Sequence, residues 1–242
     1  MLKKDTRLRG LERSVSKKVG RAIADYEMIS DGDKILVALS GGKDSLALLR
    51  MLLVRQEFVP IKYELVPVYV DFGYQCSDIT ELKNYVSEQG LLLHVRRMEI
   101  FEEKPEELTC FWCSWNRRKA LFQAALDLGC NKIAFGHHKD DIVQTILMNM
   151  LFEGQVSGMG PKQEMFGGKV FLIRPLAYVE EKETSDLAEF IGYPVSVCDC
   201  ANGQVSKRAH VKKFINELET VCPPVKSNIF KSLQRIKKDY LL

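Results

Sequence analysis

The sequence predicts one α/β domain, a doubly wound parallel sheet with helical extensions at both ends. Short apolar runs alternate with segments of helical periodicity, which implies crossover connections and therefore parallel strands. The first apolar run also leads directly into a glycine-rich turn, as in folds that bind ligands beyond the carboxyl ends of parallel strands. Of the 242 residues, 46% are hydrophobic, which is enough for one substantial core.

Apolar side chains recur at helical spacing from Leu11 to Tyr26, so we expect an amphipathic helix with a basic outer face within residues 1–30. Buried strands are expected at 35–39, 65–70, 91–95 and 132–135. Further helices are expected at 43–55, 78–89, 115–129, 141–152, 180–191, 204–219 and 226–239. Residues 154–168 hold five glycines and a proline, and we expect them to form a long mobile loop.

Charge and periodicity together divide the chain into a basic helix (1–30), an α/β domain (31–200) and basic helices packed on it (201–242). Residues 1–21 carry eight Lys and Arg against two acidic residues, and residues 204–242 carry nine against three. The net charge of the whole chain is only +3, so the middle of the chain is acidic. Two basic ends favour a polyanionic partner held at the periphery, although two solvated helices would show the same pattern.

No stretch of the sequence is long and apolar enough to span a membrane, and the first residues lack the apolar segment of a signal peptide. We therefore expect a cytoplasmic protein with no membrane partner. In that reducing compartment, seven cysteines do not indicate a disulfide framework. Metal binding or redox chemistry is the better interpretation of the cysteines.

The glycine-rich turn is the first candidate site, and it reads Ser40-Gly41-Gly42-Lys43-Asp44-Ser45 between a strand and a helix. Glycines let the backbone approach phosphate oxygens, while the serine hydroxyls and the lysine add donors and a cation. The spacing differs from the Walker pattern. Asp44 suits an anion site if a magnesium ion bridges its carboxylate to the phosphates. The alternative is a tight structural turn with Asp44 as a capping residue.

Two more strand ends carry polar residues. The second strand ends at Asp71, whose carboxylate could accept from a ribose hydroxyl or an adenine amino group, or could cap the strand end. The fourth strand runs into Gly136-His137-His138-Lys139-Asp140-Asp141. We interpret this segment as a second nucleotide loop, in which His137 contacts phosphate while Asp140 or Asp141 caps the helix or helps to hold magnesium. A metal site made from the histidines is the weaker alternative, because adjacent histidines point apart.

Four of the cysteines form two pairs in the sequence, with the members of each pair two or three residues apart. Cys110 and Cys113 are followed by Arg117 and Arg118 at the start of the helix expected at 115–129, and a helix N-terminus with two guanidiniums favours thiolates. The late pair is Cys198 and Cys200. Four thiolates would give a closed zinc or iron–sulfur site, whereas three would leave one iron of a cluster open. The remaining cysteines are expected to be ordinary thiols, and they are Cys76, Cys130 and Cys222.

Together these motifs resemble one family. The segments SGGKDS, CFWCSWNRR, GHHKDDIVQT and RPL, followed by the late cysteines, look like the tRNA 2-thiocytidine synthase family of PP-loop ATP pyrophosphatases. The resemblance spans most of the chain and implies that residues 31–200 form an ATP pyrophosphatase domain, similar to the adenine nucleotide α-hydrolases.

The resemblance implies an activity. ATP would adenylate the oxygen at C2 of an anticodon-loop cytidine with release of pyrophosphate, and sulfur would then displace AMP. A [4Fe–4S] cluster held by Cys110, Cys113 and Cys200 is implied, with Cys198 as the alternative third ligand. Cysteine desulfurase or free sulfide would supply the sulfur, and a homodimer is a further expectation. The alternatives are sulfur transfer to another tRNA base or a small molecule, a non-catalytic nucleotide-binding iron–sulfur sensor, and a structural zinc protein.

The turns, the basic ends and the resemblance together give expected roles to residues. The expected catalytic residues are Asp44, Asp141 and Cys113. The expected ATP-binding residues, with Mg²⁺, are Ser40, Gly41, Gly42, Lys43, Asp44, Ser45, Asp71, Gly136, His137 and Asp140. The expected tRNA-binding residues are Lys17, Lys18, Arg21, Arg117, Arg118, Lys207 and Arg208.

Overall fold

The computed structural model describes residues 2–73, 79–98, 110–194 and 207–240. Within this part of the chain, a six-stranded sheet has the order β3-β2-β1-β4-β6-β5, and β5 alone pairs antiparallel with its neighbour. The strands are β1 (Asp33–Leu39), β2 (Tyr63–Asp71), β3 (His94–Arg97), β4 (Lys132–Ala134), β5 (Lys162–Met165) and β6 (Val170–Ile173). The predicted α/β class with a mostly parallel sheet is therefore confirmed.

The strand order contains a switch in direction beside β1. The chain adds β2 and then β3 on one side of β1, and later adds β4 and β6 on the other side. β1 and β4 pair in parallel, from Ile35 with Lys132 to Val37 with Ala134. At such a switch point the connections leave in opposite directions, and a crevice opens beyond the carboxyl ends of the two strands.

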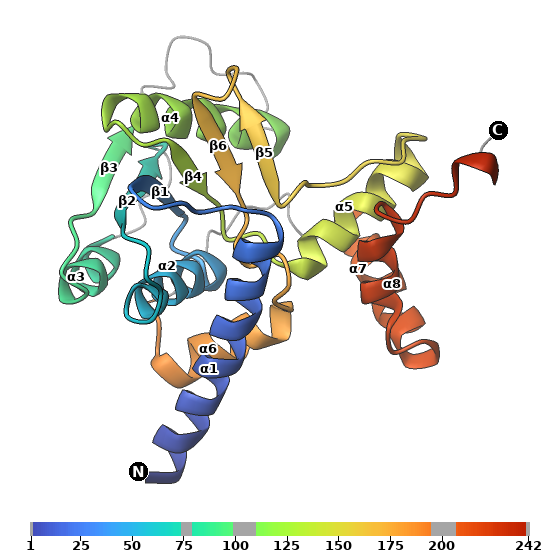
Figure 1. The fold of residues 1–242 in the computed structure, drawn as a ribbon, viewed down its shortest axis with the longest axis horizontal. Helices are drawn as coiled ribbons and strands as arrows, with labels where there is room; N and C mark the ends of the chain where they lie inside the picture. Colours follow the sequence, from blue (N-terminus) through green and yellow to red (C-terminus); the bar gives the residue numbers. More distant parts are fainter. Residues whose placement is uncertain (1, 74–78, 99–109, 195–206, 241–242) are drawn as a thin grey trace.

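Helices cover both faces of the sheet (Figure 1). One face carries α1 (Leu2–Asp25), α2 (Lys43–Gln56), α3 (Thr80–Glu88) and α6 (Glu181–Ile191). Buried side chains such as Val19, Leu49 and Leu187 join these helices to the sheet in one apolar core. The other face carries α4 (Cys110–Asp127), which packs Leu121 and Ala125 against the sheet in a second core.

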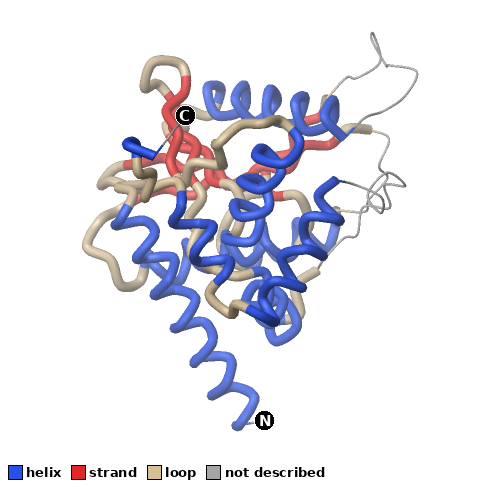
Figure 2. Tube along the Cα trace, turned by 90° about the vertical axis from the view of Figure 1, so that its right-hand side faces the viewer, coloured by secondary structure: helices blue, strands red, loops and turns tan. Residues whose placement is uncertain are grey.

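Three further helices form a separate layer beside the sheet. α5 (Lys139–Phe152) follows β4, and α7 (Lys207–Val221) and α8 (Val225–Ser232) pack against it (Figure 1). Ile146, Ile215 and Phe230 belong to the small core between them. A short 3₁₀ helix (Lys238–Tyr240) follows, and at the other end the first turns of α1 project beyond the body (Figure 2).

Two strands, β5 and β6, were not predicted from the sequence. β6 is a four-residue apolar run, too short to show a period, and it is recognisable only by its parallel pairing with β4. The expected loop over 154–168 was wrong from residue 162 onward, because β5 forms a hairpin with β6 there. Gly167 and Gly168 serve that turn, where φ is 64° and 82°. The glycines therefore mark a hairpin turn rather than one long loop.

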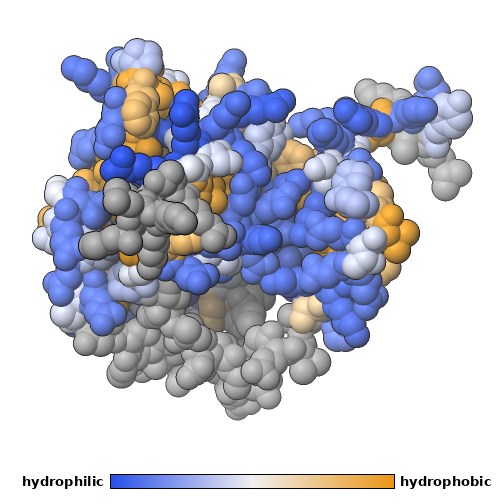
Figure 3. Space-filling view, turned by 90° about the horizontal axis from the view of Figure 1, so that it is seen from below, coloured by the Kyte–Doolittle hydropathy of each residue, from blue (hydrophilic) through white to orange (hydrophobic). Residues whose placement is uncertain are grey.

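Some element bounds also differ from the expectations. β3 begins at His94 instead of at residue 91, and the last long helix ends at Ser232 instead of at residue 239. The described surface is mostly hydrophilic when seen from below, with apolar areas that are small and near the edges of the view (Figure 3). Among the described residues, no helix has the length and apolar character needed to cross a membrane.

Candidate active site

A cavity of about 360 Å³ opens at the switch point between β1 and β4. Three segments far apart in the sequence line it: the turn after β1, the turn after β4, and one face of α4. Arg208 of α7 completes the wall. The polar lining residues are Ser40, Asp44, Ser45, Ser114, Arg117, Arg118, His137, Asp141 and Arg208.

The turn after β1 is shaped for close backbone approach. Gly41 has φ of 78°, a left-handed conformation that side chains disfavour. The serines hold the turn together: the Ser45 hydroxyl donates to Gly42 O at 2.8 Å, and Ser40 N donates to Ser45 Oγ at 3.2 Å. α2 begins at Lys43, so the unpaired N–H groups of its first turn lie at the cavity and suit an anion.

The turn after β4 approaches the first turn closely. A Cβ on Gly136 would lie 2.9 Å from the carbonyl carbon of Asp44 and from Ser45 N, so any side chain there would displace the backbone. Gly136 is therefore needed to bring the two turns together at one cavity.

His138 lies under both turns and joins their carboxylates. Its side chain is buried, and its Nε2 lies 3.5 Å from Asp141 Oδ2 and 3.9 Å from Asp44 Oδ1. Asp141 also accepts from His138 N at 3.1 Å, which caps α5, and from Arg208 Nη1 at 3.0 Å. The two carboxylates thus lie at one edge of the cavity, with the same imidazole near both.

Asp44 is fixed further by a residue from another helix. Thr184 of α6 is fully buried, and its hydroxyl lies 2.5 Å from Asp44 Oδ1, with Glu181 O farther away at 2.9 Å. Lys43 donates to both oxygens of the same carboxylate, at 2.9 and 3.0 Å. A hydroxyl has one proton to donate, and the shorter contact assigns it to the carboxylate.

His137 turns the other way, into the cavity. Its ring stacks on Phe135, with centroids 5.5 Å apart, and its buried Nδ1 has no hydrogen-bond partner in the described part of the chain. Burial, together with the nearby Arg174 charge, lowers the pKa of His137 to about 4. The imidazole is therefore neutral at neutral pH where it lines the cavity.

Arginines give the cavity a positive wall. Arg117 lies over the Phe72 ring at 5.1 Å, and Arg118 and Arg208 line the opening. Arg174 is buried behind them and donates to Gly160 O and to Gln163 Oε1. Burial lowers the pKa of Arg174 to about 10, so its guanidinium stays charged at neutral pH. Several guanidiniums gathered at one cavity suit a polyanionic ligand.

The described cysteine of the early pair lies at the cavity edge of α4. Cys113 is half-buried, and its neighbour Ser114 and Arg117, one turn later, both line the cavity. Cys110 begins α4 one turn earlier, while its side chain and all of Cys198 and Cys200 lie outside the described residues. Cys130 is buried in the core under α4, where burial raises the pKa of its thiol to about 11.

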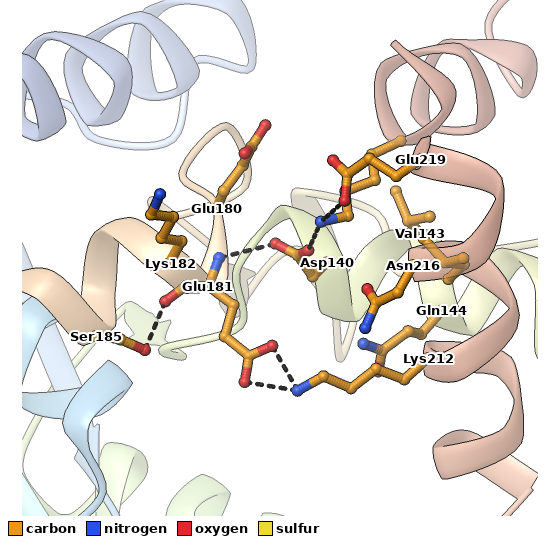
Figure 4. Close-up of a pocket in the computed structure, with 12 residues that line it drawn as sticks. Asp140, Val143, Gln144, Glu180, Glu181, Lys182, Ser185, Lys212, Asn216 and Glu219 are labelled. Atoms are coloured by element: carbon orange, nitrogen blue, oxygen red, sulfur yellow. Dashed lines mark hydrogen bonds and ion pairs between the residues drawn. The ribbon is translucent and has the colours of Figure 1, made fainter. Parts of the chain in front are cut away.

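Two of the expected ATP-binding carboxylates do not line this cavity. Asp71 accepts from Gly73 N at 2.9 Å and lies 3.6 Å from Arg97 Nε, in a separate hollow beside β3. Asp140 faces a second pocket on the other side of α5, where it accepts from Glu181 N and pairs with Lys226 at 2.9 Å (Figure 4). The role of both residues in ATP binding stays a prediction.

The sequence reasoning missed the role of three residues. Thr184 gave no signal, because a threonine in a helix has no pattern that connects it to a turn 140 residues away. Arg208 was assigned to the RNA surface on charge alone, yet its side chain lines the cavity. Arg174 belongs to the RPL motif, and only the structure shows that it supports the turn before β5.

Comparisons with known proteins place the chain in a family. A sequence profile of the PP-loop domain matches residues 11–217. A tRNA-cytidine(32) 2-sulfurtransferase of Geobacter sulfurreducens is 39% identical over 95% of this chain and 92% of the relative. The chain belongs to this family of PP-loop proteins. The Janthinobacterium sp. (strain Marseille) member is also 39% identical, over 96% of this chain and 75% of its own length.

The family membership confirms the resemblance carried by the loop, cysteine and GHH motifs. Among solved structures, the U34-tRNA thiolase NcsA from Methanococcus maripaludis with its [4Fe-4S] cluster superposes with a TM-score of 0.79. The match covers 94% of this chain and 79% of the thiolase, at 24% identity. This superposition shows that the chain and the thiolase have the same fold.

The contact between Thr184 and Asp44 predicts an effect on ATP binding. Thr184→Val keeps the shape and removes the hydroxyl that orients Asp44, so the affinity for ATP should fall by a few-fold, less than the roughly tenfold expected for a bond made to the ligand itself. Calorimetric titration with ATP and Mg²⁺ should show this loss, while Thr184→Ser should bind nearly as the wild type does. Equal affinities of the valine variant and the wild type would contradict the positioning role.

The lowered pKa of His137 predicts a pH dependence of stability. Between pH 6.5 and pH 4 the unfolded chain binds a proton at this residue that the folded chain does not, so the free energy of unfolding falls as pH falls. Protonation of this residue in the unfolded chain should make the free energy of unfolding at pH 5 lower than at pH 7 by on the order of 1–2 kcal/mol. Urea unfolding at pH 7 and pH 5 should show a larger loss for the wild type than for His137→Gln, and equal losses would contradict the assignment.

Proposed function

We propose that this protein is an ATP-dependent tRNA sulfurtransferase. It adenylates the oxygen at C2 of an anticodon-loop cytidine and replaces that oxygen with sulfur. The observation that carries the proposal is the single cavity in which the phosphate turn, the second nucleotide turn and the cysteine-bearing helix meet. Related family members are tRNA-cytidine(32) 2-sulfurtransferases, and this supports the choice of base.

The chain's own residues can perform the activation step. The glycine turn and the N-terminus of α2 hold the ATP phosphates, and Arg117, Arg118 and Arg208 neutralise charge that develops on them. His137 donates or accepts one hydrogen bond as a neutral imidazole. Adenylation is chemically necessary because a carbonyl oxygen is a poor leaving group, whereas AMP is a good one.

Magnesium fits the two carboxylates joined through His138. Asp44 and Asp141 approach the cavity from two turns and keep lone pairs available, while magnesium usually takes one or two protein carboxylates together with phosphate oxygens. We assign catalytic roles to both aspartates on this ground.

An iron–sulfur cluster fits the cavity edge of α4. Residues 110 and 113 are one turn apart on a helix whose adjacent positions line the cavity beside two guanidiniums, a setting that favours thiolates. We propose Cys110, Cys113 and Cys200 as ligands, in line with the [4Fe–4S] cluster of the M. maripaludis thiolase. A cluster held by three thiolates supplies an open iron that can carry the sulfur atom. Desulfurase or free sulfide would be the donor.

The proposed tRNA contacts fall on three parts of the surface. Lys17, Lys18 and Arg21 lie on α1, Arg117 and Arg118 lie at the cavity, and Lys207 and Arg208 begin α7. Of the α7 pair, Lys207 lies over the Phe152 ring and Arg208 pairs with Asp141. The homodimer and the cytoplasmic location stay predictions from the sequence.

The phosphate turn predicts where ATP is cleaved. A PP-loop enzyme that adenylates its substrate breaks the bond between the α- and β-phosphates, so tRNA-dependent turnover of labelled ATP should yield AMP and pyrophosphate. Chromatography of the products decides the question. ADP and phosphate as the only products would contradict cleavage between the α- and β-phosphates.

The cysteines predict a colour that can be measured. Anaerobically purified Cys110→Ala, Cys113→Ala and Cys200→Ala should each lose the brown absorbance, the iron and sulfide content and the thiolation of tRNA. ATP binding should largely survive, because the phosphate turns belong to other segments. Cys198→Ala should keep cluster and activity.

Two outcomes would revise the ligand set. If Cys198→Ala lost the cluster while Cys200→Ala kept it, the third ligand would be Cys198. If both variants lost the cluster, four thiolates would close the site and an open iron would be excluded.

A further inference from the structure

A groove of about 430 Å³ lies between the first and last long helices of the chain. Lys18 and Arg21 of α1 form one wall, and Lys231 in the last turn of α8 and Arg235 just beyond that helix form the other. Tyr178 also lines the groove. Lys139, the first residue of α5, closes one end. We call this feature the α1–α8 groove.

The α1–α8 groove is strongly cationic. Five Lys or Arg side chains line it against one carboxylate, that of Asp25. Three of the cations are paired: Lys18 with Glu183 at 2.7 Å, Lys139 with Glu180 at 2.9 Å, and Arg21 with Asp25 at 3.5 Å.

Lys231 and Arg235, by contrast, have no ion-pair partner in the described part of the chain. Both side chains are exposed, so each can turn toward an anion in the groove. Cations gathered without counter-charges repel one another, and an anionic partner relieves that repulsion. The charge therefore favours an anionic ligand over a neutral one.

The floor of the groove is aromatic. Tyr178 packs edge-on against Phe230 with centroids 5.7 Å apart, and the guanidinium of Arg21 lies 6.0 Å from the Tyr178 centroid. Cations beside an aromatic ring that is only half-buried are typical of surfaces that follow a nucleic-acid strand, where phosphates pair with the cations and bases or sugars rest on the ring.

The position of the groove connects it to the active-site cavity. Lys139 lines the groove and Asp141 lines the cavity, and two residues of chain span at most about 7 Å. The groove and the cavity therefore share the first turn of α5, with one on each side of it.

We propose that the α1–α8 groove binds the phosphate backbone of the RNA substrate next to the nucleotide that enters the cavity. Lys231 and Arg235 are its principal phosphate contacts, and Tyr178 is a surface for the adjoining base or sugar. The proposal rests on the proposed function for the identity of that RNA as a tRNA.

The test compares two pairs of charge removals in the full chain. Lys231→Ala/Arg235→Ala should weaken binding of a tRNA transcript by roughly tenfold for each contact at 0.1 M salt, and should flatten the salt dependence by about one unit of slope for each. The control is Lys62→Ala/Lys169→Ala, which removes the same charge just before the amino ends of β2 and β6. The proposal would be overturned if the groove variant and the control variant bound tRNA with the same affinity and the same salt slope.

A variant of opposite sign strengthens the test. Asp25→Asn removes the one carboxylate of the groove and can still accept from the Tyr178 hydroxyl, so tRNA should bind more tightly. ATP should bind all these variants as it binds the wild type. Loss of ATP affinity in the groove pair, with tRNA affinity retained, would identify the groove with ATP phosphates and overturn the assignment to RNA.

The same data separate this inference from the proposed function. A wild-type protein that fails to bind tRNA contradicts the proposed function itself. A wild type that binds and thiolates tRNA, beside a groove variant with unchanged affinity and slope, contradicts the groove alone.

Discussion

The active site depends on the close approach of two turns that follow β1 and β4. Gly136 makes the approach possible, because a Cβ there would meet the backbone of Asp44 and Ser45 at 2.9 Å. The approach places the first turns of α2 and α5 at one cavity, and it puts His138 within reach of both Asp44 and Asp141. The positive arginine wall, the capped α5 and the Thr184 contact are all arranged around this pair of turns.

Much of this arrangement could be predicted from the sequence because it is local. A turn with two glycines between a strand and a helix is recognisable without its neighbours, and SGGKDS was read correctly as the start of α2. The alternation of strands and helices indicated a parallel sheet, and the carboxyl ends of parallel strands lie along one edge, where the structure brings the turns after β1 and β4 together. The short strand β6 was not predicted, because a run of four apolar residues is too short to show the periodicity of a strand or a helix.

What the sequence could not provide is the direction in which a side chain points. Asp140 and Asp141 are adjacent and equally acidic, yet the geometry of α5 turns one to Lys226 in a second pocket and the other to the active-site cavity. Charge counting placed Arg208 on the RNA surface for the same reason, since its pairing with Asp141 depends on how α7 packs against α5. Such contacts follow from tertiary packing alone.

The contact between Thr184 and Asp44, and that between Arg208 and Asp141, have a consequence for biosynthesis. They join residues 140 and 67 positions apart, so the phosphate turn gains its support only after α6 has been made, and the cavity wall closes only after α7 has been made. A chain growing from the ribosome therefore has its sheet order defined well before it has a complete site. The site is therefore completed by the helices that are made last, and not by the sheet that positions its two turns.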